Sequence, residues 1–273
     1  MFSRTSLLFL IVILVNTYAE KLRIKNGFEA ENGRYPYQVY LRHKNALNNI
    51  EDGFYCGGSI IHPRFVLTAG HCVNAEEASS VEIVAGSNKL GGIDAVYYQA
   101  ELFIMHENFT DIENVNYADI ALIRLTRDMI FNDRIQPVKL ATVDYPYRNG
   151  LALTLSGWGR QGIPDRTHLN AIRMRIDDFD RCRRLIADVF LSDSRSPPRM
   201  DRSTMCLRPL NVVTGGTCTG DSGGPYVDDA GYQVGVVSWA AGCGEYAIYG
   251  ISEVATYVPY YAHWIVNKVL SFN

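Results

Sequence analysis

One stretch of the sequence places a hydroxyl group in a highly constrained backbone. Residues 220–225 read GDSGGP, and their three glycines and proline disfavour both helix and strand. Such residues are common in tight turns, which is one interpretation of the segment. The other interpretation is chemical, because a serine hydroxyl becomes a strong nucleophile beside a base that a third group orients. Ser222 is therefore a candidate nucleophile if the chain supplies both partners.

Candidate partners for Ser222 occur earlier in the chain. His71 stands in VLTAGHC, after a β-branched run and directly before a cysteine, and Asp119 stands in YADIALIRL, just ahead of an apolar run. Taken singly, each is more often a structural residue than a catalytic one. A histidine and a carboxylate are nevertheless what a serine nucleophile requires, so their joint occurrence favours acyl-transfer chemistry.

The composition describes an ordinary globular protein. With 273 residues the chain can form one large domain or two small ones, each with a sizeable core. A net charge of -3 and the lack of a Lys/Arg run argue against a nucleic-acid partner.

The N-terminus has the features of an export signal. Arg4 precedes an apolar run from Leu7 to Val15, and the small residue Ala19 follows it. A membrane anchor is the alternative, but the run is about half as long as the roughly 20 residues that a spanning helix needs. We therefore expect a signal peptide over residues 1–19, a secreted extracellular protein and no membrane association.

The cysteines fit an exported protein. Six are present, with no C-x-x-C pair and no Cys/His spacing typical of a metal site. An even number in a secreted chain favours three disulfides, although the sequence alone allows fifteen pairings. We expect no metal and no cofactor, and the acids around Glu76 do not form the alternating oxygen pattern of a calcium loop.

The elements that must position these residues are mostly short strands. Apolar runs between Gly and Asn turn signals predict strands at 37–41, 59–69, 81–86, 95–102, 120–125, 151–159, 231–240 and 249–258. Helical periodicity is visible at 177–190 and expected at 258–272. The segment 143–150 is turn-rich and could join two halves, and 191–199 is typical of an exposed loop. This pattern predicts an all-β sandwich or barrel.

Together these motifs resemble those of the chymotrypsin/trypsin-like serine proteases, which share TAAHC, DIAL and GDSGGP in this order. The similarity extends over nearly everything after Arg23 and includes CGGSII, SGWG, VVSW and the terminal WI. It implies a protease domain at 24–273 made of two packed antiparallel β-barrels, at about 24–142 and 151–258, with a C-terminal helix at about 259–271.

The resemblance also assigns roles to the candidate residues. Ser222 would attack the peptide carbonyl, His71 would accept and return its proton, and Asp119 would orient the imidazole. The backbone N–H groups of Gly220 and Ser222 would form the oxyanion hole. The matching disulfides would be Cys56–Cys72, Cys182–Cys206 and Cys218–Cys243.

Activation is implied by the residues before the domain. Cleavage after Arg23 would remove a propeptide, residues 20–23, and free the amine of Ile24 to pair with Asp221, whose burial beside the nucleophile demands a positive partner. The sequence departs from the family here, since Lys25 and Asn26 replace the usual Val-Gly. The alternative is that Arg23 is an ordinary solvated arginine.

The expected substrate pocket differs most from the family pattern. Gly216 stands where trypsin-like enzymes carry an aspartate, and Thr217, Ser238 and Ala240 complete the pocket. A gapless match back from Trp264 places Glu253 on the far wall, whereas a gapped match places Gly250 there and leaves the pocket apolar. The gapless match predicts a mixed preference for basic and bulky apolar residues, as in crab collagenase-like enzymes.

The predicted function is a secreted serine endopeptidase made as a zymogen. It would be a monomer that meets protein or peptide substrates and protein protease inhibitors. The alternative is a catalytically silent homologue acting as a secreted binding or regulatory protein, but such proteins usually lack one of the three catalytic residues. The chain also has one N-glycosylation sequon, at Asn108.

Overall fold

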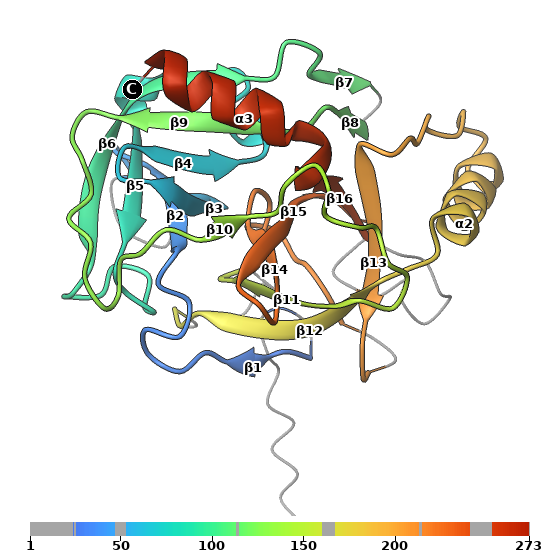
Figure 1. Ribbon diagram of the computed structural model, residues 1–273, viewed down its shortest axis with the longest axis horizontal. Coiled ribbons are helices and arrows are strands. Elements are labelled where there is room, and N and C mark those ends of the chain that lie inside the picture. Colours follow the sequence, from blue (N-terminus) through green and yellow to red (C-terminus); the bar gives the residue numbers. More distant parts are fainter. Residues whose placement is uncertain are drawn as a thin grey trace, which may run out of the picture.

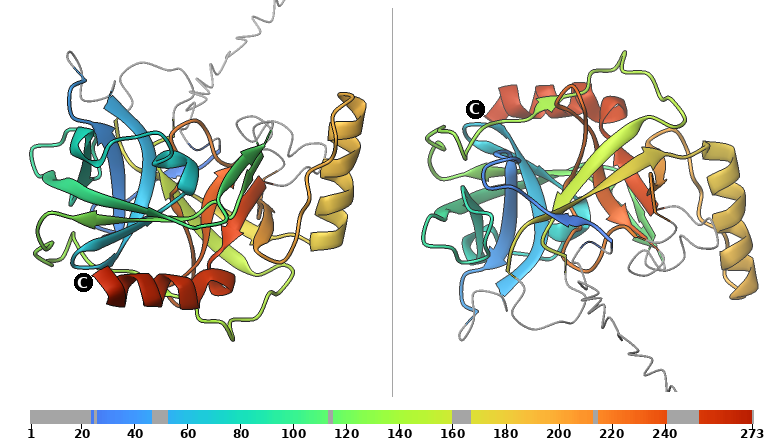
Figure 2. Two further views of the ribbon diagram at one scale, coloured as in Figure 1. Left: turned by 90° about the horizontal axis from the view of Figure 1, so that it is seen from above. Right: turned by 90° about the horizontal axis from the view of Figure 1, so that it is seen from below.

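The computed structural model describes residue 24 and residues 26–46, 53–112, 115–159, 167–212, 215–240 and 253–272. Two six-stranded antiparallel β-barrels lie side by side, with α-helices on the outside (Figure 1, Figure 2). The predicted all-β class with two packed barrels is thereby confirmed. The signal peptide and propeptide expected at residues 1–23 lie outside the described part.

The first barrel closes in the order β2-β3-β4-β9-β6-β5. In β5, the side chains of Val81, Ile83 and Ala85 point into its core, whereas Glu82 and Val84 lie on the other face, as the period-two alternation of a strand requires. Val84 is also buried there, in a second apolar cluster. The expected strand at 59–69 is two strands, because Pro63 lacks a backbone N–H and ends the first. The six strands are β2 (Gln38–His43), β3 (Phe54–His62), β4 (Phe65–Thr68), β5 (Val81–Ala85), β6 (Val96–Met105) and β9 (Ala121–Leu125).

The second barrel closes because β12 pairs with both β11 and β13. In β12, Ile172, Met174 and Ile176 are buried in the core, whereas Arg173 and Arg175 are half-buried on the opposite face. Its strands are β11 (Ala152–Gly157), β12 (Asn170–Ile176), β13 (Thr204–Pro209), β14 (Pro225–Asp228), β15 (Tyr232–Trp239) and β16 (Glu253–Tyr257).

Two short segments from the range expected for the first barrel join the second barrel. Strand β1 (Phe28–Glu29) pairs with β12, and β10 (Lys139–Leu140) runs parallel to β15. Ile24 is fully buried in the second core, together with Leu153 and Leu155. Residues near both ends of the expected range 24–142 therefore belong to the second barrel and connect it to the first.

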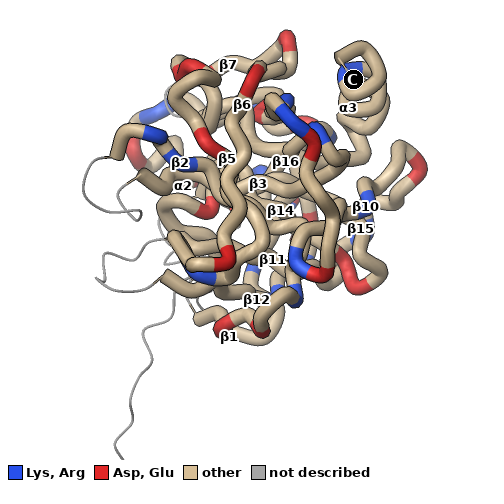
Figure 3. The backbone as a smooth tube through the Cα atoms, turned by 90° about the vertical axis from the view of Figure 1, so that its left-hand side faces the viewer, with Lys and Arg blue, Asp and Glu red and all other residues tan. Residues whose placement is uncertain are grey.

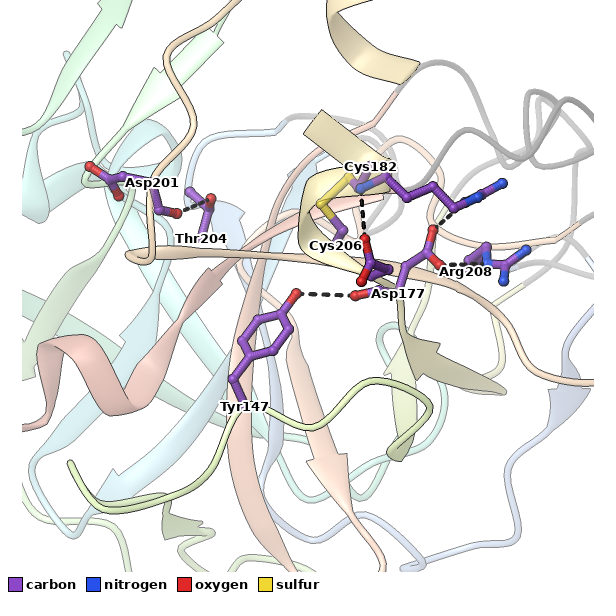
Figure 4. The surroundings of a disulfide bond; sticks show 9 residues. Tyr147, Asp177, Cys182, Asp201, Thr204, Cys206 and Arg208 are labelled. Atoms are coloured by element: carbon purple, nitrogen blue, oxygen red, sulfur yellow. Dashed lines mark hydrogen bonds and ion pairs between the residues drawn. A yellow bond between two sulfur atoms is a disulfide. The ribbon is translucent and has the colours of Figure 1, made fainter. Parts of the chain in front are cut away.

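The helices confirm the two helical predictions with small shifts. Helix α2 (Phe179–Ser192) begins after Asp178, whose carboxylate accepts a hydrogen bond from the Arg181 N–H at 2.7 Å. Asp177 precedes this N-cap residue, and its carboxylate forms ion pairs with Arg181 and Arg208 (Figure 4). The disulfide Cys182–Cys206 ties α2 to β13 (Figure 4).

Helix α3 (Val258–Phe272) packs on the first barrel although it follows the last strand of the second. Its buried side chains are Val258, Pro259, Tyr261 and Ile265. None of the helices in the described residues is long and apolar enough to cross a membrane. Acidic and basic residues are interspersed over the face drawn in Figure 3.

Candidate active site

His71 and Asp119 are brought together by the pairing of β4 with β9. His71 lies in the 3-10 helix η1 (Gly70–Cys72) just after β4, Asp119 lies just before β9, and Thr68 is opposite Ala121. His71 Nδ1 lies 2.8 Å from Asp119 Oδ2, and the His71 backbone N–H donates to Asp119 Oδ1 at 2.9 Å. A ring that donates from Nδ1 presents Nε2 as the basic nitrogen.

The second barrel completes the surroundings of Asp119. The Ser238 hydroxyl donates to Asp119 Oδ2 at 2.5 Å, and the Thr256 hydroxyl donates to the Asp119 carbonyl at 2.7 Å. The Asp119 side chain is 1% exposed, whereas that of His71 is 24% exposed. The carboxylate is thus held from both barrels, while the imidazole remains partly accessible to solvent.

The environment of His71 strengthens it as a base. Burial lowers the pKa of His71, but the charge and hydrogen bond of Asp119, with a further contribution from Asp111, outweigh it and raise the pKa above its ordinary 6.5. A base with a raised pKa takes a proton from a nucleophile more readily.

The Ser222 loop packs against the segment that leads to His71. Gly220 and Gly223 have φ values of 96° and 78°, a conformation that side chains rarely adopt. A side chain at Gly223 would overlap the Thr68 hydroxyl. The Gly57 N–H donates to the Ser222 carbonyl at 2.7 Å, and the disulfide Cys56–Cys72 fixes this region to η1.

Two backbone donors of the loop are available to a ligand. Among the described residues, the N–H groups of Gly220 and Ser222 have no hydrogen-bond acceptor, while the neighbouring Asp221 and Gly223 N–H groups donate to the Cys218 and Val237 carbonyls. The Ser222 hydroxyl likewise has no hydrogen-bond partner in the described part of the chain, and therefore makes none with His71. Catalytic hydrogen bonds are often long in the absence of substrate.

Ala118, the residue before Asp119, is strained. Its φ is 45°, in the left-handed region that costs a non-glycine residue about 1–2 kcal/mol, and its carbonyl accepts from the Ile120 N–H at 2.8 Å. We expect Ala118→Gly to raise the free energy of unfolding by about 0.5–1 kcal/mol, because glycine adopts this φ freely. Denaturant titration measures the change.

A matched control for Ala118→Gly lies in α3. Ala262 is a half-buried helical residue, so Ala262→Gly should lower the free energy of unfolding by about 1 kcal/mol. If Ala118→Gly destabilises the protein as much as this control does, the left-handed conformation of Ala118 is not a source of strain.

Asp221 is a fully buried carboxylate beneath the loop. It accepts hydrogen bonds from the N–H groups of Gly159, at 2.8 Å, and Cys218, at 2.9 Å. Side chains at Gly157 or Gly159 would overlap it. No cation neutralises it among the described residues, so burial raises its pKa to about 7.

A pocket of about 220 Å³ opens beside Ser222. Its walls include Thr217, Val237, Ser238, Trp239 and Ala240. Glu253 lies behind Thr217, where its carboxylate accepts from the Thr217 N–H at 2.6 Å and the Tyr226 hydroxyl at 2.8 Å. It fits only because Gly216 has no side chain, since any Cβ there would overlap Glu253. Burial raises the pKa of Glu253 to about 7.

Several expected site residues lie outside the described part, namely Arg23, Cys243 and Gly250. Cys218 is disulfide-bonded, but its expected partner Cys243 is among them. Cys56, His71 and Cys72 cluster closely enough for a metal, yet both sulfurs are bound in a disulfide and offer no thiolate.

Three functional contacts were not anticipated from the sequence: those of Thr256 and Ser238 with Asp119, and that of Tyr226 with Glu253. Tyr226 directly follows GDSGGP, which is the one local signal that could have pointed to it. Thr256 and Ser238 carry no such signal, since each lies more than 100 residues from Asp119.

Two β-barrels with this histidine–aspartate pair and serine loop define the chymotrypsin-like class of proteins. The sequence model of the Trypsin family matches residues 24–265. The chain is 35% identical to chymotrypsin-2 of Vespa crabro, covering 90% of this chain and all of that protein. It is 31% identical to tryptase of Mus musculus, over 90% and 88% of the two chains.

A solved structure gives the same result. Neuropsin, a serine protease expressed in the limbic system of mouse brain, superimposes with a TM-score of 0.73 at 26% identity, over 89% of this chain and 99% of that one. The chain belongs to the trypsin family of serine endopeptidases.

Proposed function

We propose that the chain is a secreted, monomeric serine endopeptidase, made as a zymogen and activated by cleavage after Arg23. The observation that carries this proposal is the buried Asp119 bonded to His71 Nδ1 beside the packed Ser222 loop. A silent binding protein would have no need of a buried carboxylate held by His71 of the first barrel and by the Ser238 hydroxyl of the second.

The geometry supports the following chemistry. His71 Nε2 removes the Ser222 proton as the hydroxyl oxygen attacks the peptide carbonyl, and Asp119 stabilises the resulting imidazolium. The carbonyl oxygen becomes an anion, which the free N–H groups of Gly220 and Ser222 bind; losing one such donor typically costs about 3 kcal/mol. The imidazolium then protonates the leaving amine, and water completes the hydrolysis of the acyl-enzyme.

This proposal is tested by labelling the purified chain, with Ile24 as its first residue, with a serine-directed fluorophosphonate. Covalent labelling at Ser222 together with hydrolysis of peptide amides would support it. A correctly activated protein that is neither labelled nor active would make the silent homologue the better description.

For specificity we propose a mixed preference for basic and bulky apolar residues on the acyl side of the cleaved bond. Glu253 supports this assignment because its buried carboxylate lies behind the pocket and hydrogen-bonds to a wall residue, Thr217. Since its pKa is about 7, Glu253 is neutral below that pH and negative above it. The preference for Lys and Arg should therefore strengthen as the pH rises through 7.

We expect Glu253→Gln to weaken cleavage after Lys and Arg by roughly 1–3 kcal/mol, the scale of a poorly paired buried polar group. Cleavage after apolar residues should change little. Peptide-library profiling at pH 6 and pH 8 measures both effects, and the mutant should lose the pH dependence of the basic-to-apolar ratio.

The matched control is Asp144→Asn, which makes the same chemical change at an exposed acid. It should leave the profile unaltered. If Glu253→Gln leaves the basic-to-apolar ratio unchanged as well, the pocket is apolar, as the gapped match with Gly250 predicts.

A further inference from the structure

The sequon Asn108-Phe109-Thr110 occupies an exposed turn between β6 and the hairpin β7 (Thr110–Ile112)–β8 (Val115–Tyr117). The Asn108 and Thr110 side chains are exposed, and the middle residue is not proline. Among the described residues, the side-chain amide of Asn108 has no hydrogen-bond partner; only its backbone N–H is engaged, with His106 Nδ1 at 3.2 Å. A glycan on Asn108 would thus displace no interaction.

The turn that carries Asn108 is firmly attached to helix α3. The Phe109 N–H donates to the His106 carbonyl at 2.9 Å, and the His106 ring packs on Trp264 with centroids 5.1 Å apart. Glu107 accepts from Trp264 Nε1 at 2.9 Å and pairs with Lys268 at 2.5 Å. A glycan attached here would therefore project from a fixed point.

This attachment point at Asn108 lies beside His71, the candidate base for the Ser222 nucleophile. The Phe109 ring packs so closely on Gly70 that a Cβ there would be 2.6 Å from it, and Gly70 precedes His71. The His106 N–H also donates to the Ile120 carbonyl at 3.1 Å, next to Asp119. On the other side of the sequon, Asp111 is close enough to His71 to influence it electrostatically.

We propose that Asn108 carries an N-linked glycan that stands at the rim of the active-site cleft and slows the approach of large folded molecules to Ser222. Short peptides and small reagents pass beneath it. This role rests on the proposed function as a secreted protease, whereas attachment of the glycan rests on export alone. A bulky hydrophilic group at one rim restricts access by size and leaves the chemistry unchanged.

The first measurement is carbohydrate on the chain secreted from insect cells. We expect the intact mass to fall on treatment with peptide N-glycosidase, and both Asn108→Gln and Thr110→Val to abolish this fall. Thr110→Ser keeps the sequon and is the matched control that should retain the glycan. A secreted wild-type chain without carbohydrate at Asn108 would overturn the proposal.

The second measurement compares two fluorophosphonates on the activated chain, one small and one coupled to streptavidin by a short linker. With the glycan present, the large reagent should label Ser222 about tenfold more slowly relative to the small one than it does in Asn108→Gln, within the range over which association rates vary. The small reagent should label all variants equally.

An equal rate ratio in glycosylated wild type and Asn108→Gln would overturn the access role. Failure of both reagents on every activated variant would instead reject the proposed protease function and the access role with it. The mass measurement would still decide whether Asn108 is modified.

Discussion

Replacing Ser222 with alanine is expected to lower kcat for peptide amides by about 10⁶-fold, the loss seen when a triad nucleophile is removed. Without the hydroxyl no acyl-enzyme forms, so the residual hydrolysis comes from binding and the oxyanion donors alone. The Gly220 and residue-222 N–H groups are backbone groups and survive the substitution. The measurement is a comparison of kcat and KM for one peptide amide, in which kcat should fall while KM changes little.

The variant should remain folded, because the Ser222 hydroxyl has no hydrogen-bond partner among the described residues. Its unfolding midpoint should match that of wild type. Ser79→Ala, at an exposed serine in η2 (Ala78–Ser80), is the matched control and should retain full activity. A Ser222→Ala protein that still hydrolyses peptides at the wild-type rate would show that the nucleophile lies elsewhere.

The candidate site was predictable because its demands on the sequence are local. A left-handed loop needs glycines at 220 and 223, so GDSGGP is recognisable without knowledge of the fold. His71 and Asp119 each adjoin an apolar strand whose pattern is visible in the sequence. Their roles, by contrast, came from resemblance, since neither residue is distinctive alone.

What escaped prediction depends on contacts between distant parts of the chain. Strands β12 and β13 combine arginines with buried apolar residues, so their alternation is weak, and β14 has only four residues. Their identity as strands follows from pairing in the barrel and less from propensity. Likewise, Ser238 was expected only as a wall residue of the substrate pocket. The packing of the second barrel against the first also brings its hydroxyl to the Asp119 carboxylate.

The assignment of segments to barrels was limited for the same reason. Sequence order placed Ile24 and Lys139 with the first barrel. The Ile24 side chain is instead buried in the second core, and Lys139 pairs with β15 of the second barrel. An edge strand of two residues carries no hydrophobic pattern that could identify its partner. The location of Ile24 in the second core bears directly on activation, because Asp221 is bound at the end of the neighbouring strand β11.

Arg23→Gln is expected to leave the secreted chain without measurable peptidase activity. Asp221 is buried without a cation among the described residues, and its two N–H donors do not prevent burial from raising its pKa to about 7. Cleavage after Arg23 would supply an ammonium group at Ile24, whose side chain already lies in the second core. That ion pair would stabilise the loop that presents the oxyanion donors. Amidase assays of the secreted variant, before and after treatment with an activating protease, measure the effect.

Two controls separate cleavage from any direct role of the arginine. Arg34→Gln makes the same change at an exposed arginine and should leave activation intact. A removable N-terminal fusion whose protease leaves Ile24 as the first residue should give full activity without Arg23. In that form Asp221→Asn should abolish activity, since the amine would have no carboxylate to pair with.

The pH dependence of the activated form follows from the same pair. The amine has an ordinary pKa near 8, which pairing with Asp221 would raise in the folded state. The stabilisation by this ion pair is therefore complete below about pH 8 and is lost as the pH rises through the pKa of the amine in the folded state.

On the acid side, protonation of His71 stops catalysis as the pH falls. The midpoint of this loss should lie above pH 6.5, because Asp119 raises the pKa of His71. Activity should thus be bell-shaped, with an alkaline limb that is reversible and accompanied by slower fluorophosphonate labelling. Full activity of Arg23→Gln with residues 20–23 still attached, or an activated chain with no alkaline limb, would contradict activation through the Ile24 amine.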